Sequence, residues 1–206
     1  MKITIQGKRL PTIETQRLML KEISVVDISE DYITWLNNPE TTKYLEIRFS
    51  PQSREAVEAY VLAKLADTVY TKHFGVYDRN GERLVGTVTL PHIDWNHSFA
   101  DISFVVGHPE AQGHGYATEA VHGVCYYMFV ECGLRKVCGG YYHVHEASAR
   151  VFAKNGFTVE GRVKKKYVID DNQYADHILA GLLADEYKAV ERYLGQLPPV
   201  MTMQDL

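Results

Sequence analysis

Three consecutive apolar segments between His73 and Val106 constrain the fold of this chain more than any other feature. They read HFGVYD, LVGTVTL and FADISFVV, and their side chains alternate in polarity or stay apolar throughout, as those of β-strands do. Arg79-Asn80-Gly81-Glu82 separates the first two segments, and Asn-Gly favours a hairpin turn because both residues tolerate positive φ. The sequence therefore predicts an antiparallel meander that stops at His108-Pro109.

A long amphipathic helix is predicted directly after this meander, from Tyr116 to Glu131. Its apolar residues lie three or four positions apart and therefore share one face: Ala117, Ala120, Val121, Val124, Cys125, Met128 and Phe129. Gly133 is the expected end of the helix, because glycine readily adopts the left-handed conformation that closes one.

The other predicted elements lie on either side of these two features. In chain order they are a strand at 14–23, helices at 27–36 and from Ser50-Pro51 onward, a strand at 136–142, a helix at 147–154, a hairpin with strands at 157–168 and 174–183, and a helix at 185–193. This order predicts an α+β fold with a mixed, mostly antiparallel central sheet flanked by helices.

The composition fits a single folded unit. The chain has 206 residues, of which 46% are hydrophobic, and at this length one core is stable without metal ions or disulfides. Nothing in the sequence has the character of a linker, so residues 1–195 are expected to form one domain, followed by a C-terminal tail at 196–206.

Charge and cysteine content exclude several classes of protein. The formal net charge is −4, which argues against a nucleic-acid partner, and the basic run Lys164–Lys166 is too short to change this. No stretch approaches the roughly 20 apolar residues of a membrane span, so we expect a cytoplasmic protein without a membrane partner. Cys125, Cys132 and Cys138 lack CxxC spacing, so we expect reduced thiols and no metal site.

A glycine-rich segment precedes the long helix and reads Gln112-Gly113-His114-Gly115-Tyr116-Ala117-Thr118. Its glycines let the backbone turn tightly, while the free amides of the first helical turn attract an anion. The segment lacks the lysine of a Walker loop, and Thr118 stands where a Rossmann fingerprint needs a third glycine. It predicts a phosphate or pyrophosphate cradle, with a plain tight turn as the alternative.

Two motifs resemble the GNAT superfamily of acyl-CoA N-acyltransferases. Gln112 to Ala117 is similar to its pyrophosphate motif Q-x-x-G-x-A, and His145 to Phe157 is similar to its segment N-x-x-S-x-x-V-x-x-K-x-G-F. Its RimJ/RimL-like branch is suggested by Glu14-Thr15-Gln16-Arg17-Leu18, Ala100-Asp101-Ile102-Ser103 and Glu160-Gly161. The resemblance runs from about residue 12 to 190 and implies an enzyme that transfers an acetyl group from acetyl-CoA to a primary amine.

The resemblance also implies which residues bind acetyl-CoA. The strand Phe104-Val105-Val106 would splay from its neighbour and pair with the pantetheine arm, as a strand edge pairs with a peptide. The amides of the glycine-rich segment would hold the pyrophosphate. The expected cofactor-binding residues are Phe104, Val105, Val106, Gln112, Gly113, His114, Gly115, Tyr116, Ala117, Thr118, His145 and Ser148.

The expected catalytic residues are Asp101, Ser148 and His145. The reaction needs a base for the amine and a proton or hydrogen bond for the leaving thiolate. Asp101 lies where relatives often have Glu and is the first candidate for the base, with a structural or substrate-binding carboxylate as the alternative. The family commonly has Tyr where this chain has Phe152, so Ser148, one turn earlier, is the expected partner of the thiolate. The alternatives are Tyr141, Tyr142 and Tyr167.

His145 departs from the family pattern, which has Asn at this position to help hold the cofactor arm. An imidazole can still donate or accept a hydrogen bond there. Because His143 lies two residues earlier, the pair could instead face the substrate with His145 as a base, or both could be ordinary polar residues near a strand end. Two histidines do not make a metal site.

The acceptor amine is the part of the function that the sequence constrains least. Tyr32–Glu40 and Lys43–Glu46 resemble GNAT proteins of glycan pathways, whose acceptors are amino groups on nucleotide-linked sugars. Arg48, Arg54 and Lys164–Lys166 are candidates to bind the diphosphate of such a molecule. We therefore expect a small-molecule amine such as an amino sugar nucleotide. A peptide N-terminus and a non-catalytic acyl-CoA-binding module are the alternatives, and a homodimer is compatible with either.

Overall fold

The computed structural model describes residues 11–67, 69–79, 83–170, 172–190 and 193, and the strands in this part form two five-stranded sheets. The first contains, in spatial order, β1 (Ile13–Glu14), β2 (Leu18–Glu22), β3 (Lys72–Asp78), β4 (Arg83–Leu90) and β7 (Ser103–Val106). The second contains β5 (Ile93–Asp94), β6 (Phe99–Asp101), β8 (Lys136–Tyr142), β10 (Gln173–Leu183) and β9 (Thr158–Asp170).

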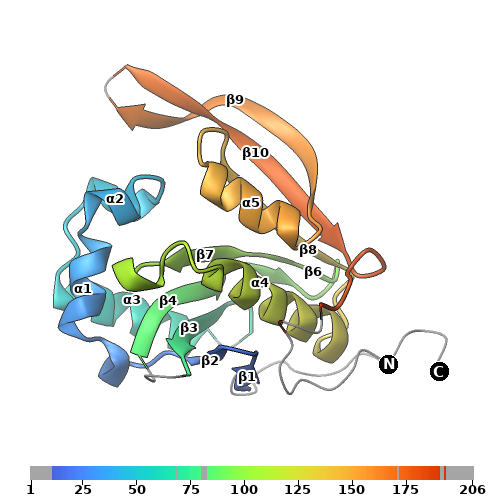
Figure 1. Ribbon diagram of the computed structural model, residues 1–206, viewed down its shortest axis with the longest axis horizontal. Coiled ribbons are helices and arrows are strands. Elements are labelled where there is room, and N and C mark those ends of the chain that lie inside the picture. The colour runs from blue at the N-terminus through green and yellow to red at the C-terminus, as the bar shows by residue number, and fades with distance from the viewer. Residues whose placement is uncertain (1–10, 68, 80–82, 171, 191–192, 194–206) are drawn as a thin grey trace.

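The helices confirm the predicted α+β class and mostly follow the predicted ranges (Figure 1). They are α1 (Glu30–Leu36), α2 (Pro39–Thr42), α3 (Arg54–Ala66), α4 (Tyr116–Tyr126) and α5 (Glu146–Lys154), with short 3-10 turns η1 (Val25–Asp27), η2 (Glu46–Phe49) and η3 (Pro109–Ala111). α3 begins at Arg54 and not at Ser50, because the Ser53 hydroxyl accepts a hydrogen bond from the Ala56 amide and so caps the helix there. α4 continues as one π-helical turn, Tyr127–Glu131, so the predicted helix at 116–131 is helical throughout.

The strand predicted over 99–106 is interrupted at Ile102, where the chain passes from one sheet to the other. β6 pairs with β8 in parallel as far as Asp101 and Cys138, and the Ile102 amide then donates to the Cys138 carbonyl at 2.8 Å. β7 pairs instead with β4, in antiparallel register from Ser103 to Val106. Beyond Ile102 the strands β7 and β8 therefore diverge, which confirms the predicted splay.

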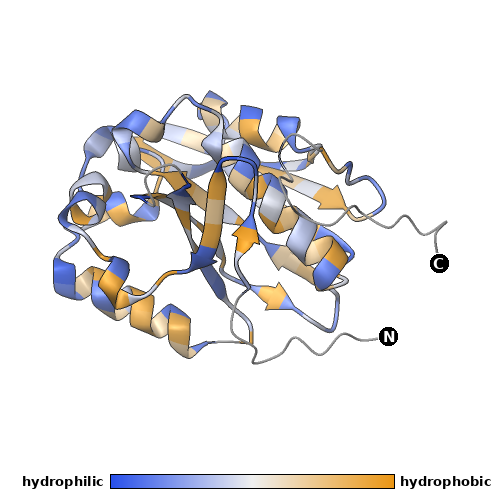
Figure 2. Ribbon diagram, turned by 60° about the horizontal axis from the view of Figure 1, so that its bottom comes forward, coloured by the Kyte–Doolittle hydropathy of each residue, from blue (hydrophilic) through white to orange (hydrophobic). Residues whose placement is uncertain are grey.

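The helices cover both faces of the first sheet. α4 packs against β1, β2, β4 and β7, and its residues from Thr118 to Tyr126 are buried. On the other face α1 and α3 enclose a second apolar cluster around Tyr32, Trp35, Val57 and Val61. Figure 2 shows this pattern as hydrophobic colour along the strands and on one side of the helices. The edge of β7 at the splay is thus held between two packed layers.

One predicted element is wrong. Residues 185–190 form a turn and irregular backbone, not the first part of a helix at 185–193. The Tyr187 hydroxyl hydrogen-bonds to Nε2 of His122 at 2.9 Å, and the Val190 amide donates to the same nitrogen at 3.0 Å. These contacts to α4 hold the segment against the core. The Tyr187 amide still donates to the Leu183 carbonyl at 3.1 Å, but the Val190 amide bonds to His122 in place of a helical carbonyl. The tail predicted at 196–206 lies outside the described residues, so the domain boundary at 195 stays a prediction.

No helix in the described ranges is both long and apolar enough to cross a membrane. Among the same residues, no three His, Cys, Asp or Glu side chains lie together as metal ligands would.

Candidate active site

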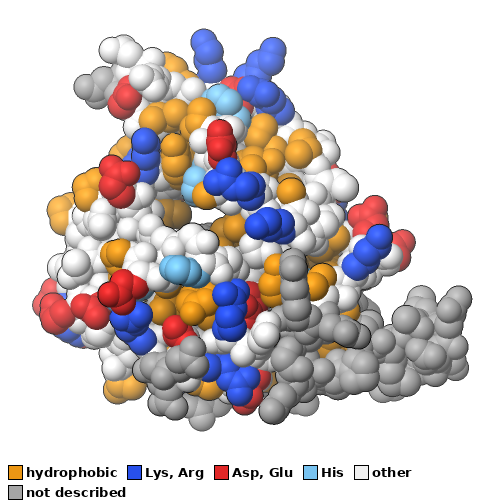
Figure 3. Space-filling view, in the orientation of Figure 1, with side chains coloured by type: hydrophobic (Ala, Val, Ile, Leu, Met, Phe, Trp, Pro, Cys, Tyr) orange, Lys and Arg blue, Asp and Glu red, His pale blue; other side chains and the backbone are white. Residues whose placement is uncertain are grey.

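A cavity of about 460 Å³ lies where the two sheets diverge, between β7, the loop at 112–115, the first turn of α4 and α5. Figure 3 shows this face of the molecule hollowed near its centre. We call it the loop cavity. It is lined by Phe104, Val105, Val106, Gln112, Gly113, Gly115, Tyr116, Ala117, Thr118, His145 and Ser148. Of the expected cofactor-binding residues only His114 is not part of its lining.

The glycine-rich loop gives this cavity a row of free backbone amides. Gly113 and Gly115 have φ of +79° and +80°, which favours glycine at both positions. Gly115 is the N-cap of α4, and no side chain caps the helix there. The carbonyl of Gly115 accepts the first helical hydrogen bond, which the Glu119 amide donates. Within the part of the chain that the structure describes, the amides of 113–118 donate no hydrogen bond. Such free amides at the positive end of a helix dipole fit a phosphate or pyrophosphate.

Arg17 and Glu119 fix the position of this loop. Glu119 is fully buried, and its carboxylate accepts hydrogen bonds from the Arg17 guanidinium, the Arg17 amide and the Thr15 hydroxyl, each at 2.7 Å. The Arg17 guanidinium also donates to the carbonyl of His114 at 2.9 Å. The N-terminal motif around Arg17 therefore holds two parts of the site in place. It binds the loop through the His114 carbonyl and the first turns of α4 through the Glu119 carboxylate.

We expect Glu119→Gln to destabilise the protein by about 3 kcal/mol, because it leaves a partly buried guanidinium without its charged partner. Urea unfolding followed by circular dichroism measures this loss. Glu58→Gln is the matched control, since Glu58 forms an exposed pair with Arg54 at 3.8 Å, and a change within about 0.5 kcal/mol is expected there. Equal losses in the two variants would contradict the anchoring role of Glu119.

Cationic side chains also border the loop cavity on the α5 side. Arg150 and Lys154 lie one helical turn apart and both line the cavity, opposite Glu40 of α2. Arg150 is paired with Glu146 at 3.1 Å on the exposed helix surface. Lys154 is the lysine of the second motif, so this motif position lies in the same cavity as the glycine-rich loop.

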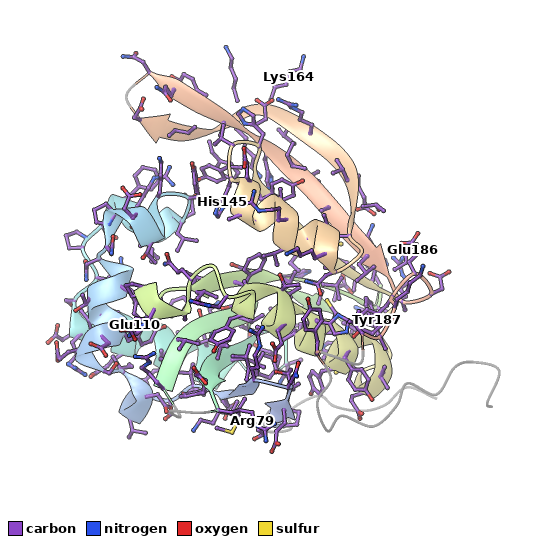
Figure 4. All side chains as sticks on the ribbon, viewed as in Figure 1. Arg79, Glu110, His145, Lys164, Glu186 and Tyr187 are labelled. Carbon is purple, nitrogen blue, oxygen red and sulfur yellow. The ribbon has the colours of Figure 1, made fainter. Side chains whose placement is uncertain are left out.

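Ser148 and His145 meet at the inner end of the loop cavity. Ser148 is buried, while Figure 4 shows His145 at the end of α5 that faces α2. The His145 ring stacks on Tyr44 with ring centres 4.4 Å apart. Burial and the nearby Arg150 lower the pKa of His145 below its usual value, so its ring is neutral at pH 7. The structure thus brings two of the three expected catalytic residues together.

Asp101, the third expected catalytic residue, lies apart from them. It is the last residue of β6, in register with Cys138 on β8, and its amide donates to the His92 carbonyl at 2.9 Å. Burial raises the pKa of its carboxyl group above the usual value, although His92 opposes this. Asp101 does not line the loop cavity or the two cavities described next, so its role as a base stays a prediction.

Two further cavities meet the loop cavity at β7. The sheet cavity, of about 270 Å³, lies over β3, β4 and β7 beneath α1 and α3. The hairpin cavity, of about 210 Å³, reaches Tyr167 and His177 of the β9–β10 hairpin. Leu45 and Phe104 line all three cavities, and Ser148 lines the loop and hairpin cavities. The three cavities therefore adjoin at these residues.

Phe152 has a packing role in this region. It is buried and contacts Phe104, Tyr141 and Phe157, with ring centres 4.9 to 5.6 Å apart. A Cβ on Gly139 would lie 2.5 Å from its ring, so the strand needs glycine where the ring packs. The ring that replaces the family's tyrosine thus fills the core behind Ser148.

The sequence linked the segment after α2, Lys43–Glu46, to the acceptor, but it did not reveal which distant residues this segment contacts. Tyr44 and Leu45 line the loop and hairpin cavities, and Glu46 lines the hairpin and sheet cavities. The Tyr142 hydroxyl donates to the Glu46 carboxylate at 3.0 Å, and Arg48 donates to the Val168 carbonyl of the hairpin. These contacts join residues that are distant in the chain, so no local motif signals them.

Comparison with known proteins agrees with this geometry. A family model described as Acetyltransferase (GNAT) domain matches residues 17–158. Spermidine N(1)-acetyltransferase of Escherichia coli (strain K12) is 30% identical over 150 residues, which are 69% of this chain and 77% of that protein. The uncharacterized N-acetyltransferase YoaA of Bacillus subtilis (strain 168) is 28% identical over 156 residues, 75% of this chain and 87% of that protein.

Solved structures show the same fold at lower identity. RimL, a ribosomal L7/L12 alpha-N-protein acetyltransferase in complex with coenzyme A, superposes with a TM-score of 0.75 at 16% identity, over 85% of this chain and 99% of that one. Spermidine N-acetyltransferase from Vibrio cholerae, in complex with CoA and spermine, gives 0.73 at 23% identity, over 83% and 98%. The family model covers more than half of the chain, so the chain belongs to the GNAT acetyltransferase family and is an acyl-CoA-dependent N-acetyltransferase.

Proposed function

We propose that this enzyme transfers the acetyl group of acetyl-CoA to the primary amine of a small molecule that enters the sheet cavity. The observation that carries this proposal is that the loop cavity, with its free amides, adjoins the sheet cavity on the other side of β7. We call the place where they adjoin, at Leu45 and Phe104, the junction. Thioester and amine can meet there without either leaving its own cavity.

The loop cavity fits acetyl-CoA. The amides of 113–118 and the cation of Lys154 suit the pyrophosphate, and the free edge of β7 suits the amides of the pantetheine arm. Bound in this way, the arm runs along Phe104 to Val106 and brings the thioester sulfur to the Ser148 hydroxyl. Nothing in this arrangement requires a metal ion, since backbone amides can polarise the thioester carbonyl.

Glu46 and His145 are the residues that we assign to the amine. Glu46 is the one carboxylate among the residues that line the sheet and hairpin cavities, so it attracts an ammonium group to the junction. His145 lines the junction on the cofactor side, and its neutral ring can take the proton that the nitrogen loses during attack. These positions favour His145 over Asp101 as the base.

The lining of the sheet cavity favours a small monoamine. A polyamine would need several carboxylates, and among the described residues that line this cavity Glu46 is the single one. A peptide would need free backbone partners, whereas the described lining consists mainly of apolar and aromatic residues such as Tyr32, Ile47 and Tyr60.

An amino sugar nucleotide would extend from the junction toward the hairpin. Of the cations expected to bind its diphosphate, Arg54 is engaged by Glu30 and by the Ile28 carbonyl. Lys166 lies beside His177, which lines the hairpin cavity. Arg48 is likewise engaged by the carbonyls of Leu45 and Val168, so that acceptor would depend on Lys166.

Product analysis by mass spectrometry tests the proposed function. The enzyme is incubated with acetyl-CoA and with separate pools of small monoamines, amino sugar nucleotides, polyamines and peptides. We expect acetylation in the first two pools and at most traces in the others. Acetylation confined to peptides or to polyamines would overturn the proposed acceptor class.

Glu46→Gln tests whether Glu46 binds the amine. The amide keeps the size of the side chain and removes its charge, so we expect KM for the amine to rise about tenfold while KM for acetyl-CoA changes little. Glu40→Gln is the matched control, because Glu40 borders only the loop cavity. An equal rise in amine KM in both variants would point to a general loss of negative charge and not to a site at Glu46.

A further inference from the structure

His73 is a buried side chain of the sheet cavity that the proposed reaction does not use. It lies on β3 with 5% of its surface exposed, and its Nδ1 is 2.7 Å from the Thr89 hydroxyl on β4. Its Nε2 is buried and has no hydrogen-bond partner among the described residues. Leaving a buried polar atom unpaired is costly. His73 lines the sheet cavity and a small cavity beside Lys64, so a polar group bound in the sheet cavity next to the ring would be a partner for this nitrogen.

The position of His73 relative to the junction is fixed by the sheet register. Ser103 on β7 pairs with Thr89 on β4, and Thr89 pairs with His73 on β3. The three side chains therefore lie in one row on one face of the sheet, and all three line the sheet cavity. Neighbouring strands are about 4.8 Å apart, so the backbones at His73 and Ser103 lie about 10 Å apart. Side chains stand roughly perpendicular to a sheet, so about the same distance separates His73 from the junction next to Ser103.

The chemistry of His73 suits a neutral polar group. Burial, with a contribution from Lys64, lowers the pKa of His73 to about 4, so the ring is uncharged at pH 7 and does not repel a cationic amine. Tyr60 packs edge-on against the ring, with centres 5.5 Å apart, and helps to hold its orientation. A hydroxyl group can donate or accept, so it pairs with Nε2 in either tautomer of the imidazole.

We propose that His73 determines acceptor specificity by hydrogen-bonding, through Nε2, to a hydroxyl group at the end of the acceptor opposite its reacting amine. This inference rests on the proposed function, since it needs an amine in the sheet cavity. Of the about 10 Å between the junction and His73, a hydrogen bond takes about 3 Å. The remaining distance of about 7 Å corresponds to six bonds of an extended chain, at about 3.5 Å for every three bonds. The preferred substrates are therefore hydroxylated amines of this length.

A pair of isosteric amines tests the role of His73. 5-Amino-1-pentanol has six bonds between its nitrogen and oxygen, and n-hexylamine has a methyl group in place of the hydroxyl. We expect the enzyme to acetylate the amino alcohol with a kcat/KM at least about tenfold higher, because the alkylamine leaves Nε2 unpaired. His73→Leu should abolish this preference, and Thr89→Val, which removes the partner of Nδ1, should reduce it.

His122→Gln is the matched control. His122 is equally buried but lies on α4, outside the three cavities, with its ring nitrogens near Asn155 and Tyr187. Its replacement is expected to lower stability and to leave the ratio of the two kcat/KM values unchanged. If His73→Leu does not fold, the ¹⁵N signals of His73 in the intact enzyme provide the second measurement. They should shift with 5-amino-1-pentanol and not with n-hexylamine.

The outcomes separate this inference from the proposed function. Equal acetylation of the two amines, or a preference that survives in His73→Leu, overturns the role of His73 and leaves the proposed function standing. Failure of both amines to react or to shift the His73 signals also overturns that role. The pooled product analysis then decides independently whether the enzyme acetylates small monoamines at all.

Discussion

Gly113→Glu is expected to weaken acetyl-CoA binding by at least about 100-fold, as measured by isothermal titration calorimetry. Gly113 has φ of +79° and lines the loop cavity, and a Cβ at this position would meet no atom within 4 Å. The new carboxylate would thus enter open space beside the free amides of 113–118. It would occupy the position of the pyrophosphate and repel it, and a loss of about 2.7 kcal/mol or more of binding free energy corresponds to the expected factor.

Gly133→Glu is the control that separates this effect from backbone strain. Gly133 has φ of +67°, and a Cβ there would also meet no atom within 4 Å, but the residue lies beyond the end of the long helix and not in the cavity. Both variants carry the same cost of a side chain in the left-handed region, about 1 kcal/mol. Gly115→Glu is a poorer test, because the Arg17 guanidinium lies 3.7 Å from its Cβ and would attract the carboxylate. Unchanged acetyl-CoA affinity in Gly113→Glu would overturn the pyrophosphate assignment.

The parts of the site that the sequence predicted are those with a local signal. Gly113 and Gly115 precede an amphipathic helix, so their conformation and the free amides after them follow from a few adjacent residues. The family resemblance predicted that the strand at Phe104 splays from its neighbour. It did not predict at which residue the two strands separate. Residues 99–106 form one apolar run, and only the bond from Ile102 to Cys138 on β8 shows where the chain changes sheets.

The parts that sequence reasoning missed depend on contacts between distant segments. Glu119 has the pattern of a polar residue on an amphipathic helix, yet it is fully buried because Arg17 and Thr15 satisfy its carboxylate. The predicted helix at 185–193 failed for the same reason, since the Val190 amide donates to the His122 ring on α4 in place of a helical carbonyl. Periodicity reports which face of a segment is apolar, but it does not report which polar partner another segment supplies.

Ser148→Ala is expected to lower the rate of acetyl transfer by about 10- to 100-fold while acetyl-CoA affinity stays unchanged. Ser148 is buried and lies where the loop cavity meets the hairpin cavity, and Phe152 beside it has no proton to donate. The Ser148 hydroxyl is therefore placed to donate a hydrogen bond to the thiolate as it leaves. Hydrogen bonds to charged groups contribute about 1.5 to 3 kcal/mol, which corresponds to this range of rates.

The measurement for Ser148 must isolate the chemical step, because release of CoA can limit kcat. Single-turnover mixing of enzyme with acetyl-CoA and a saturating amine gives the rate of acetyl transfer directly. Ser148→Thr keeps the hydroxyl and should restore most of the rate, whereas a packing role alone would make threonine, with its added methyl group in a buried position, worse than alanine. A Ser148→Ala rate within twofold of the unaltered enzyme would instead assign the thiolate to one of Tyr141, Tyr142 and Tyr167, which line the hairpin cavity.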